Sequence, residues 1–144
     1  MVALGLNIHF FFQKKISLPG ATRLKAFIGN VFKLEKKKLK RLNYIFCSDK
    51  YLLKINQEWL GHSFYTDTIS FDLSESPKEV IGEIYISVDR VKDNANSLKT
   101  SFKQELLRVI FHGTLHLCDY KDKNKMGKDK MRNKEEHYLA KYLK

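Results

Sequence analysis

The sequence predicts a single α+β domain over residues 1–144, in which a small mixed β-sheet of about four strands packs with helices in the order βαβαββααα. Three observations predict it. The chain has 144 residues, the usual size of one domain. Its hydrophobic fraction of 43% can bury a core without disulfides. Segments with alternating apolar residues are interleaved with segments of helical spacing, and neither a repeat nor a linker divides the chain.

The first part of the chain predicts two strands, each followed by a helix. Residues 7–13 alternate as a strand, and after a Pro-Gly turn residues 22–34 carry apolar side chains at helical spacing. Residues 42–47 read as the second strand. Ser48 or Asp49 can cap the helix that follows.

The middle of the chain predicts a strand pair and a polar helix. Residues 66–73 and 81–88 both alternate, and the short link between them favours pairing. A polar helix is expected over residues 91–98.

The most regular helix should begin after Ser101, which with Gln104 has the form of a capping box, and reach residues 119–120. Residues 121–128 are Lys-rich and predict a loop with Gly127 as its flexible point. A last helix is expected from residue 129 to the C-terminus.

The composition gives the first functional indication. Twenty-seven Lys and Arg against 16 Asp and Glu leave a net charge of +11, which favours a polyanionic partner such as nucleic acid. The basic run at residues 33–41 could hold phosphates, but it is read first as a solvated helix end followed by an exposed strand start.

The same composition bears on the compartment. Cys47 and Cys118 lie far apart in apolar contexts, as expected of small core residues in a reducing compartment. Residues 1–6 are apolar but lack the features of an export signal, and no apolar run is long enough for a membrane span. We therefore expect a cytoplasmic protein without a membrane partner.

His112 and His116 are the candidate metal ligands within the regular helix. Residues four apart share one helix face, so both imidazoles can bind one ion. Asp122 follows just beyond the expected helix end, where a bend could return its carboxylate to the ion. The alternative is that both His residues merely pack or form hydrogen bonds. Glu105, earlier on the same side, is either a residue that orients a ligand or a surface residue.

Three protein ligands would leave one position of a zinc ion open for water or substrate, and this arrangement suits hydrolysis. No side chain is fixed by spacing as a general base, so we expect metal-bound water to be the nucleophile. A zincin protease would place Glu directly after the first His, where this chain has Gly113. That glycine predicts close approach by another backbone or by substrate.

Three motifs resemble one known family. Residues 112–122 read His-Gly-Thr-Leu-His-Leu-Cys-Asp-Tyr-Lys-Asp, similar to the signature His-Gly-x-Leu-His-Leu-x-Gly-Tyr-Asp-His of the YbeY family. Asn56 and residues 66–71, Thr-Asp-Thr-Ile-Ser-Phe, resemble the family's Asn followed by Thr-Asp-Val-Leu-Ser-Phe. Residues 82–84, Gly-Glu-Ile, stand where the family has Gly-Asp-Ile. The resemblance covers essentially the whole chain.

The resemblance implies a metal-dependent endoribonuclease that acts on single-stranded RNA, matures the 3′ end of small-subunit ribosomal RNA and serves ribosome quality control. It also implies one zinc ion per chain, held at the positions of His112, His116 and Asp122, and partners among ribosomal RNA, the ribosome, and ribosomal or GTPase proteins.

Four of the departures from the family pattern bear on the site. Asp122 replaces the third His, which weakens the ion as a Lewis acid and widens its tolerance for manganese. Asp119 replaces the Gly, and Lys121 replaces the following Asp and could meet a phosphate. Leu60 replaces an Arg considered important for activity, for which His62 or Lys121 could substitute as a phosphate contact.

Two alternatives stay open, and Leu60 favours the first of them. One is a ribosome-assembly factor that binds ribosomal RNA, with a mainly structural metal and little nuclease activity. The other is a hydrolase of peptides or small molecules, against which both Gly113 and the basic charge speak.

Overall fold

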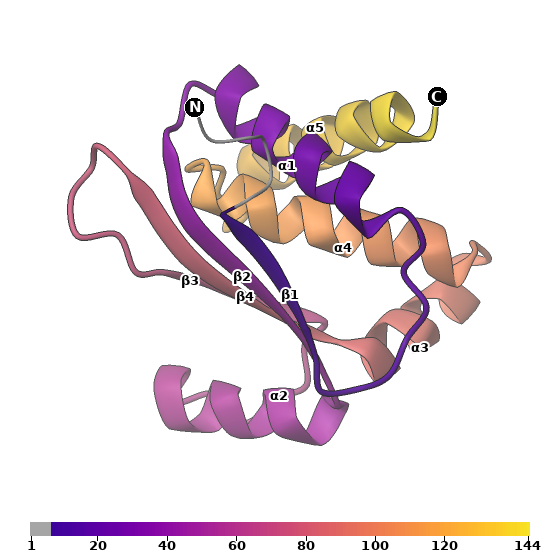
Figure 1. The fold of residues 1–144 in the computed structure, drawn as a ribbon. Helices are drawn as coiled ribbons and strands as arrows, with labels where there is room; N and C mark the ends of the chain where they lie inside the picture. Colours follow the sequence, from indigo (N-terminus) through magenta and orange to yellow (C-terminus); the bar gives the residue numbers. More distant parts are fainter. Residues whose placement is uncertain (1–6) are drawn as a thin grey trace.

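The computed structural model describes residues 7–144 and shows one α+β domain built on a four-stranded sheet of order β1-β2-β4-β3 (Figure 1). Strand β1 spans Ile8–Phe12, β2 spans Leu39–Cys47, β3 spans Thr68–Asp72 and β4 spans Val80–Ser87. The β1/β2 and β2/β4 pairs are parallel, and β3 runs antiparallel to β4. The predicted fold class and strand pairing are confirmed. The expectation about an export signal concerns residues 1–6 and lies outside the described residues.

Helices cover both faces of this sheet (Figure 1). Helices α1 (Ala21–Leu34), α4 (Phe102–Leu117) and α5 (Lys125–Leu143) lie on one side, and α2 (Asp49–Ile55) lies on the other. Helix α3 (Val88–Leu98) follows β4 directly and packs against α4. No helix within residues 7–144 is long and apolar enough to cross a membrane.

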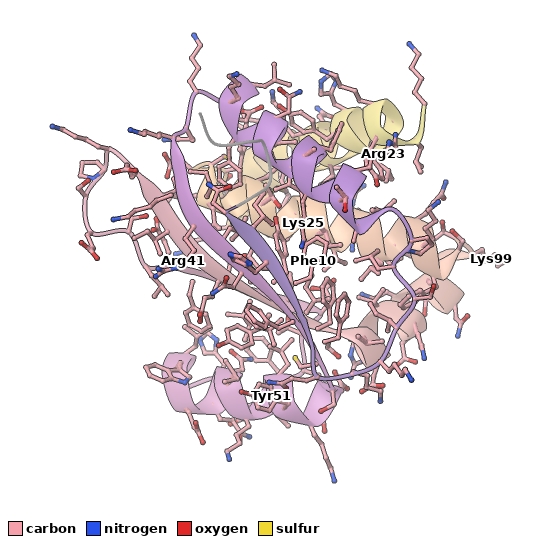
Figure 2. The ribbon with its side chains drawn as sticks, in the orientation of Figure 1. Phe10, Arg23, Lys25, Arg41, Tyr51 and Lys99 are labelled. Atoms are coloured by element: carbon pink, nitrogen blue, oxygen red, sulfur yellow. The ribbon has the colours of Figure 1, made fainter. Side chains whose placement is uncertain are left out.

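The main core fills the space between the sheet and helices α1, α4 and α5. Phe10 of β1 packs edge-on against Tyr44 of β2, and the Lys25 ammonium of α1 lies over the Phe10 ring (Figure 2). A smaller cluster under α2 joins four buried residues, Ile45, Cys47, Leu52 and Ile69. Basic side chains such as Arg41 and Lys99 are exposed around these cores (Figure 2).

Both cysteines occupy the predicted core positions as free thiols. Burial raises the pKa of Cys47 and of Cys118 to about 12, so both stay protonated near neutral pH. Thiols held in this state are poor nucleophiles.

Side-chain caps start four of the helices. The Ser48, Ser87 and Ser101 hydroxyls each accept from a backbone N–H in the first turn of α2, α3 and α4, and the Asn124 side chain does so for α5. The reciprocal half of the expected capping box is not seen, because Gln104 accepts from the Thr100 hydroxyl instead.

Several boundaries differ from the predicted ones: β2 begins at Leu39 and not at residue 42, and α4 ends at Leu117 and not at residues 119–120. Val88 begins α3 and does not end a strand, because Ser87 caps there. A π-helical turn, η1 (Asn56–Leu60), continues α2. Helix α5 begins at Lys125, so the expected loop over residues 121–128 is wrong in its second half.

Gly127 is therefore a helical residue and not a flexible point. A Cβ there would lie 2.4 Å from the Lys121 carbonyl oxygen, so glycine lets the loop before α5 pack against the first turn of this helix.

Candidate metal centre

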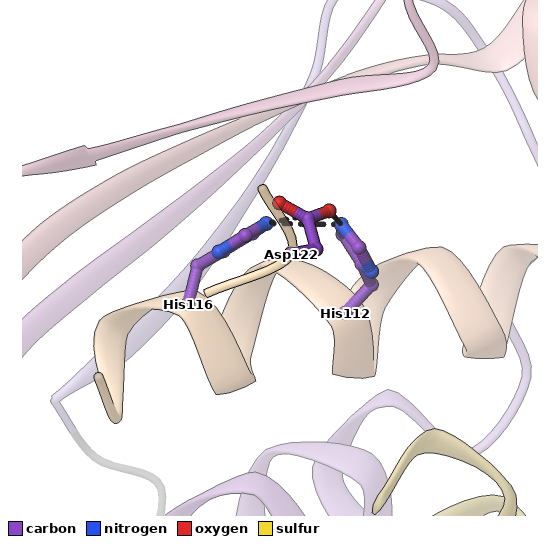
Figure 3. Close-up of side chains that lie close together, drawn as sticks. All are labelled: His112, His116 and Asp122. Atoms are coloured by element: carbon purple, nitrogen blue, oxygen red, sulfur yellow. Dashed lines mark hydrogen bonds and ion pairs between the residues drawn. The ribbon is translucent and has the colours of Figure 1, made fainter. Parts of the chain in front are cut away.

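Helix α4 brings His112 and His116 together on its cleft-facing side (Figure 3). Their ring centroids are 4.6 Å apart and their Nε2 atoms 3.0 Å apart. The Asp122 carboxylate returns to the same point, with Oδ2 3.4 Å from Nε2 of His112 and 3.6 Å from Nε2 of His116. The structure thus groups the three residues that the sequence singled out.

The loop after α4 turns back because Asp119 adopts a left-handed conformation, with φ of 73°. The Asp119 carboxylate accepts from the Lys37 ammonium, which ties the turn to the segment between α1 and β2. Asp therefore fills the position of the family's glycine.

Glu35 at the end of α1 also fixes this loop. Its carboxylate accepts from the Tyr120 hydroxyl at 2.7 Å, from Lys134 Nζ at 3.2 Å and from the Tyr138 hydroxyl. Burial opposes ionisation of Glu35, but the hydrogen bonds from Tyr138, Tyr120 and Lys134 lower its pKa overall.

Hydrogen bonds at the far side of each imidazole determine which nitrogen is free. His112 Nδ1–H donates to Glu135 Oε2 at 2.5 Å, and His116 Nδ1–H donates to the Tyr120 carbonyl at 2.9 Å. Both acceptors lack a proton to give, so the two Nε2 lone pairs face each other and the Asp122 carboxylate. With both imidazoles in this tautomer, three electron-pair donors converge on one point, and a cation there would stabilise the arrangement.

The protonation state of His116 suits this arrangement. Burial lowers its pKa, and the neighbouring His112 lowers it further, while the Asp122 charge opposes both. His116 is accordingly neutral near pH 7, the state in which imidazole binds a metal.

The donor set also fits the size of a zinc ion. Ligands about 2.0–2.1 Å from a tetrahedral ion lie about 3.3 Å from one another. The three separations here, 3.0, 3.4 and 3.6 Å, bracket that value. The residues present therefore fit one face of a tetrahedral site.

Glu135 on α5 contacts the candidate site, and the sequence reasoning missed it. It is 5% exposed and also accepts from Arg108 Nη1 at 3.1 Å. It lies 23 residues from His112 on another helix, so local spacing could not link them. The available signal was an acid at helical spacing between two core residues of α5, Met131 and Tyr138.

Glu105 has a different role from either of the two expected. It is 2% exposed, so it is not a surface residue, and it binds Arg108 rather than a histidine, at 2.5 and 2.9 Å. Arg108 Nη2 also lies 3.5 Å from Asp67, whose pKa burial raises and the Arg108 charge lowers in part. Arg108 thus joins three carboxylates behind the His pair.

The triad opens into a cleft of about 740 Å³. His62, Lys121 and Leu60 all line it, so the two candidate phosphate contacts and the residue that replaces the family's Arg share one cleft with the His pair. Gly113 does not face this opening. A Cβ at Gly113 would lie 2.8 Å from Ile84 and 3.1 Å from the Ser70 hydroxyl, so side chains of the sheet, and neither backbone nor substrate, require the glycine.

A sequence model of one family, described as endoribonuclease YbeY, matches residues 11–143. The chain belongs to the YbeY family. A relative from Cytophaga hutchinsonii named endoribonuclease YbeY is 45% identical over 91% of this chain and 93% of its own length. A second, from Flavobacterium johnsoniae, is 43% identical over 92% and 95%.

The fold agrees with YbeY membership. A solution structure of a Thermotoga maritima protein superposes with a TM-score of 0.59 at 26% identity, over 94% of this chain and 88% of that one. The recognised signature of the YbeY family therefore lies on α4 and the loop after it, where the structure groups the triad.

Proposed function

We propose that the chain is a metal-dependent endoribonuclease that cleaves single-stranded RNA at an ion held by His112, His116 and Asp122. Membership of the YbeY family, and relatives named endoribonuclease YbeY, make the chain an endoribonuclease and hence a hydrolase. The observation that carries the metal is the set of three ligand atoms, one each from His112, His116 and Asp122, that lie within 4.8 Å of one another.

The side chains of the cleft have distinct parts in this proposal. When bound, zinc supplies Lewis acidity toward a phosphate oxygen and lowers the pKa of water to about 7. Glu135 and the Tyr120 carbonyl hold the two imidazoles with Nε2 free. Lys121 and His62, which line the same cleft, are proposed to bind the RNA strand, Lys121 through its phosphates.

Zinc is the proposed metal because two imidazoles and one carboxylate are a donor set that zinc binds in hydrolytic enzymes. The carboxylate also suits manganese. We propose one ion per chain, since the described residues 7–144 contain a single such group of His, Cys, Asp and Glu.

The proposed biological substrate is ribosomal RNA, at the 3′ end of the small-subunit species, in the cytoplasm and with ribosomal or GTPase proteins as partners. Support comes from the family resemblance and from the net charge of +11, which favours a polyanion. Accumulation of small-subunit RNA with an unprocessed 3′ end in cells that lack the protein is the expected observation, and normal 3′ ends would contradict it.

The test of the activity pairs elemental analysis with cleavage of single-stranded RNA, for the wild type and for Asp122→Ala. The expected result is one ion per chain and cleavage that a chelator stops, with both reduced in the variant. Wild-type protein that carries stoichiometric metal and leaves single-stranded RNA intact would refute the proposal.

Leu60 favours a second candidate, a ribosome-assembly factor with a structural metal, because an apolar side chain lines the cleft where the family has Arg. In that case His112→Ala would impair stability and biological function in proportion, without any RNA cleavage by the wild type. A His112→Ala protein that keeps its fold yet loses RNA processing would exclude this candidate.

A further inference from the structure

The η1 turn and the segment that joins it to β3 expose aromatic rings. Trp59 is 70% exposed, Phe64 57% and Tyr65 50%. An exposed ring forgoes the free energy that burial of its apolar surface would supply, and a cluster of such rings marks a binding surface. Phe64 and His62 from this segment line the same cleft as the triad.

Two of the rings are arranged as a stack. The rings of His62 and Phe64 lie 5.1 Å apart between centroids, with 20° between their planes. This nearly parallel pair has the geometry in which planar aromatic groups, nucleobases included, add to a stack.

Asn56 holds the stacked pair in place. Its side chain is buried, at 2% exposure, and its Nδ2 donates to the Phe64 carbonyl at 2.9 Å. The backbone carbonyl of Asn56 accepts from the backbone N–H of His62 at 3.2 Å. Gly61 permits this turn through a left-handed conformation with φ of 68°. The backbone on both sides of the pair is therefore fixed before any ligand arrives, which reduces the entropy lost on binding.

Lysines line the same cleft, beside the carboxylates of Asp119 and Asp122. Lys121 and Lys123 line it from the loop after α4, and neither forms an ion pair with a carboxylate among residues 7–144. Stacked rings and lysines without a carboxylate partner in one cleft match a single strand, which offers both bases and phosphates. A protein or lipid partner would need no planar stack in the same cleft as the lysines.

We propose that the stacked rings of His62 and Phe64 form a base-stacking subsite, which binds one nucleobase of single-stranded RNA while its phosphates lie toward Lys121 and Lys123. This inference rests on the proposed function, because it takes RNA as the ligand. Stacking accepts every base, since each has an aromatic face, so the subsite selects unpaired over paired RNA rather than one sequence over another.

The test measures binding of a ten-nucleotide single-stranded RNA with phosphorothioate linkages, which resist hydrolysis, to the metal-loaded full chain. An oligomer with the same backbone but without bases is the second ligand. Phe64→Leu removes the ring and keeps apolar volume, whereas Phe64→Tyr keeps the ring. Phe11→Leu is the matched control, because Phe11 is 50% exposed on β1 and does not line the cleft.

We expect Phe64→Leu to bind the RNA roughly tenfold more weakly or worse, as loss of one stacked base implies. Binding of the base-free oligomer should be unchanged, and Phe64→Tyr and Phe11→Leu should bind RNA as the wild type does. Equal RNA affinity of Phe64→Leu and wild type would overturn the subsite, and so would an equal loss for both ligands.

The binding assay does not measure cleavage, so its result can be compared with a separate cleavage assay, and the inference and the proposed function can fail independently. Loss of base-dependent binding in Phe64→Leu, together with a wild type that never cleaves ordinary RNA, would support the subsite and refute the nuclease. Cleavage by the wild type with unaltered binding by Phe64→Leu would do the reverse.

Discussion

Replacement of Glu135 by Gln isolates the contribution of the buried carboxylate behind the His pair. Its two oxygens accept from two donors, His112 Nδ1–H at 2.5 Å and Arg108 Nη1 at 3.1 Å. A Gln amide offers one acceptor oxygen and one NH2 group, so one of these two contacts would place two hydrogen-bond donors against each other. When the NH2 group faces His112, the imidazole must move its proton to Nε2, which removes the lone pair that would bind the ion.

Loss of such a supporting contact costs about 10- to 100-fold in metal affinity, which is about 1.4–2.7 kcal/mol. The stability of the metal-free fold should be affected less than metal affinity. Arg108 keeps Glu105 at 2.5 Å and Asp67 at 3.5 Å as partners, so it is not left as an unpaired buried charge. We expect the free energy of unfolding of the metal-free variant to fall by no more than about 2 kcal/mol.

The assay is competition for zinc against a chromophoric chelator at neutral pH, with thermal unfolding of the metal-free protein measured in parallel. Glu136→Gln is the control, because Glu136 is exposed on the same helix and loses the same charge. Zinc affinity of Glu135→Gln equal to that of the wild type would show that the carboxylate does not set the tautomer of His112.

Three further changes test other parts of the account. Hydrogen bonds lower the pKa of Glu35 in the fold despite its burial, so the stability that its carboxylate adds is present above its ordinary pKa of 4.5 and is lost as the pH falls through the folded pKa. Glu35→Gln should therefore flatten the fall of the free energy of unfolding below pH 4.5. Parallel pH curves for variant and wild type would contradict this. Gly113→Ala should lower the free energy of unfolding by about 1–3 kcal/mol in urea titrations, because the added Cβ would lie 2.8 Å from Ile84, and an equally stable variant would disprove the packing argument. Asp122→His should raise affinity for zinc relative to manganese, since imidazole suits zinc and carboxylate suits manganese; an unchanged ratio would show that Asp122 is not a ligand.

The sheet and the helices packed on it could be predicted because their signals are local. The alternation in residues 7–13 and the spacing in residues 22–34 mark β1 and α1 to within a residue or two. The start of α5 could not be placed, because the Lys-rich composition favoured a loop and Gly127 suggested flexibility. The Asn124 cap was the overlooked signal, and the close approach of the Lys121 carbonyl is what requires the glycine.

The candidate site likewise combines residues that a local pattern predicts with residues that only the tertiary fold brings together. His112 and His116 are four apart on one helix, so their proximity follows from helix geometry alone, and Asp122 follows from a turn of a few residues. Glu135 reaches His112 only because α5 packs against α4, a tertiary contact that no local pattern encodes. The role of Asn56, which holds the exposed rings through its buried amide, was equally invisible without the fold.

The most direct test of the central claim is diffraction at the zinc absorption edge from crystals of the zinc-loaded protein. The account predicts one anomalous peak per chain, about 2.0–2.2 Å from Nε2 of His112, from Nε2 of His116 and from an Asp122 oxygen, with the remaining position open to the cleft. A peak elsewhere, or a fourth protein side chain that closes the site, would contradict it.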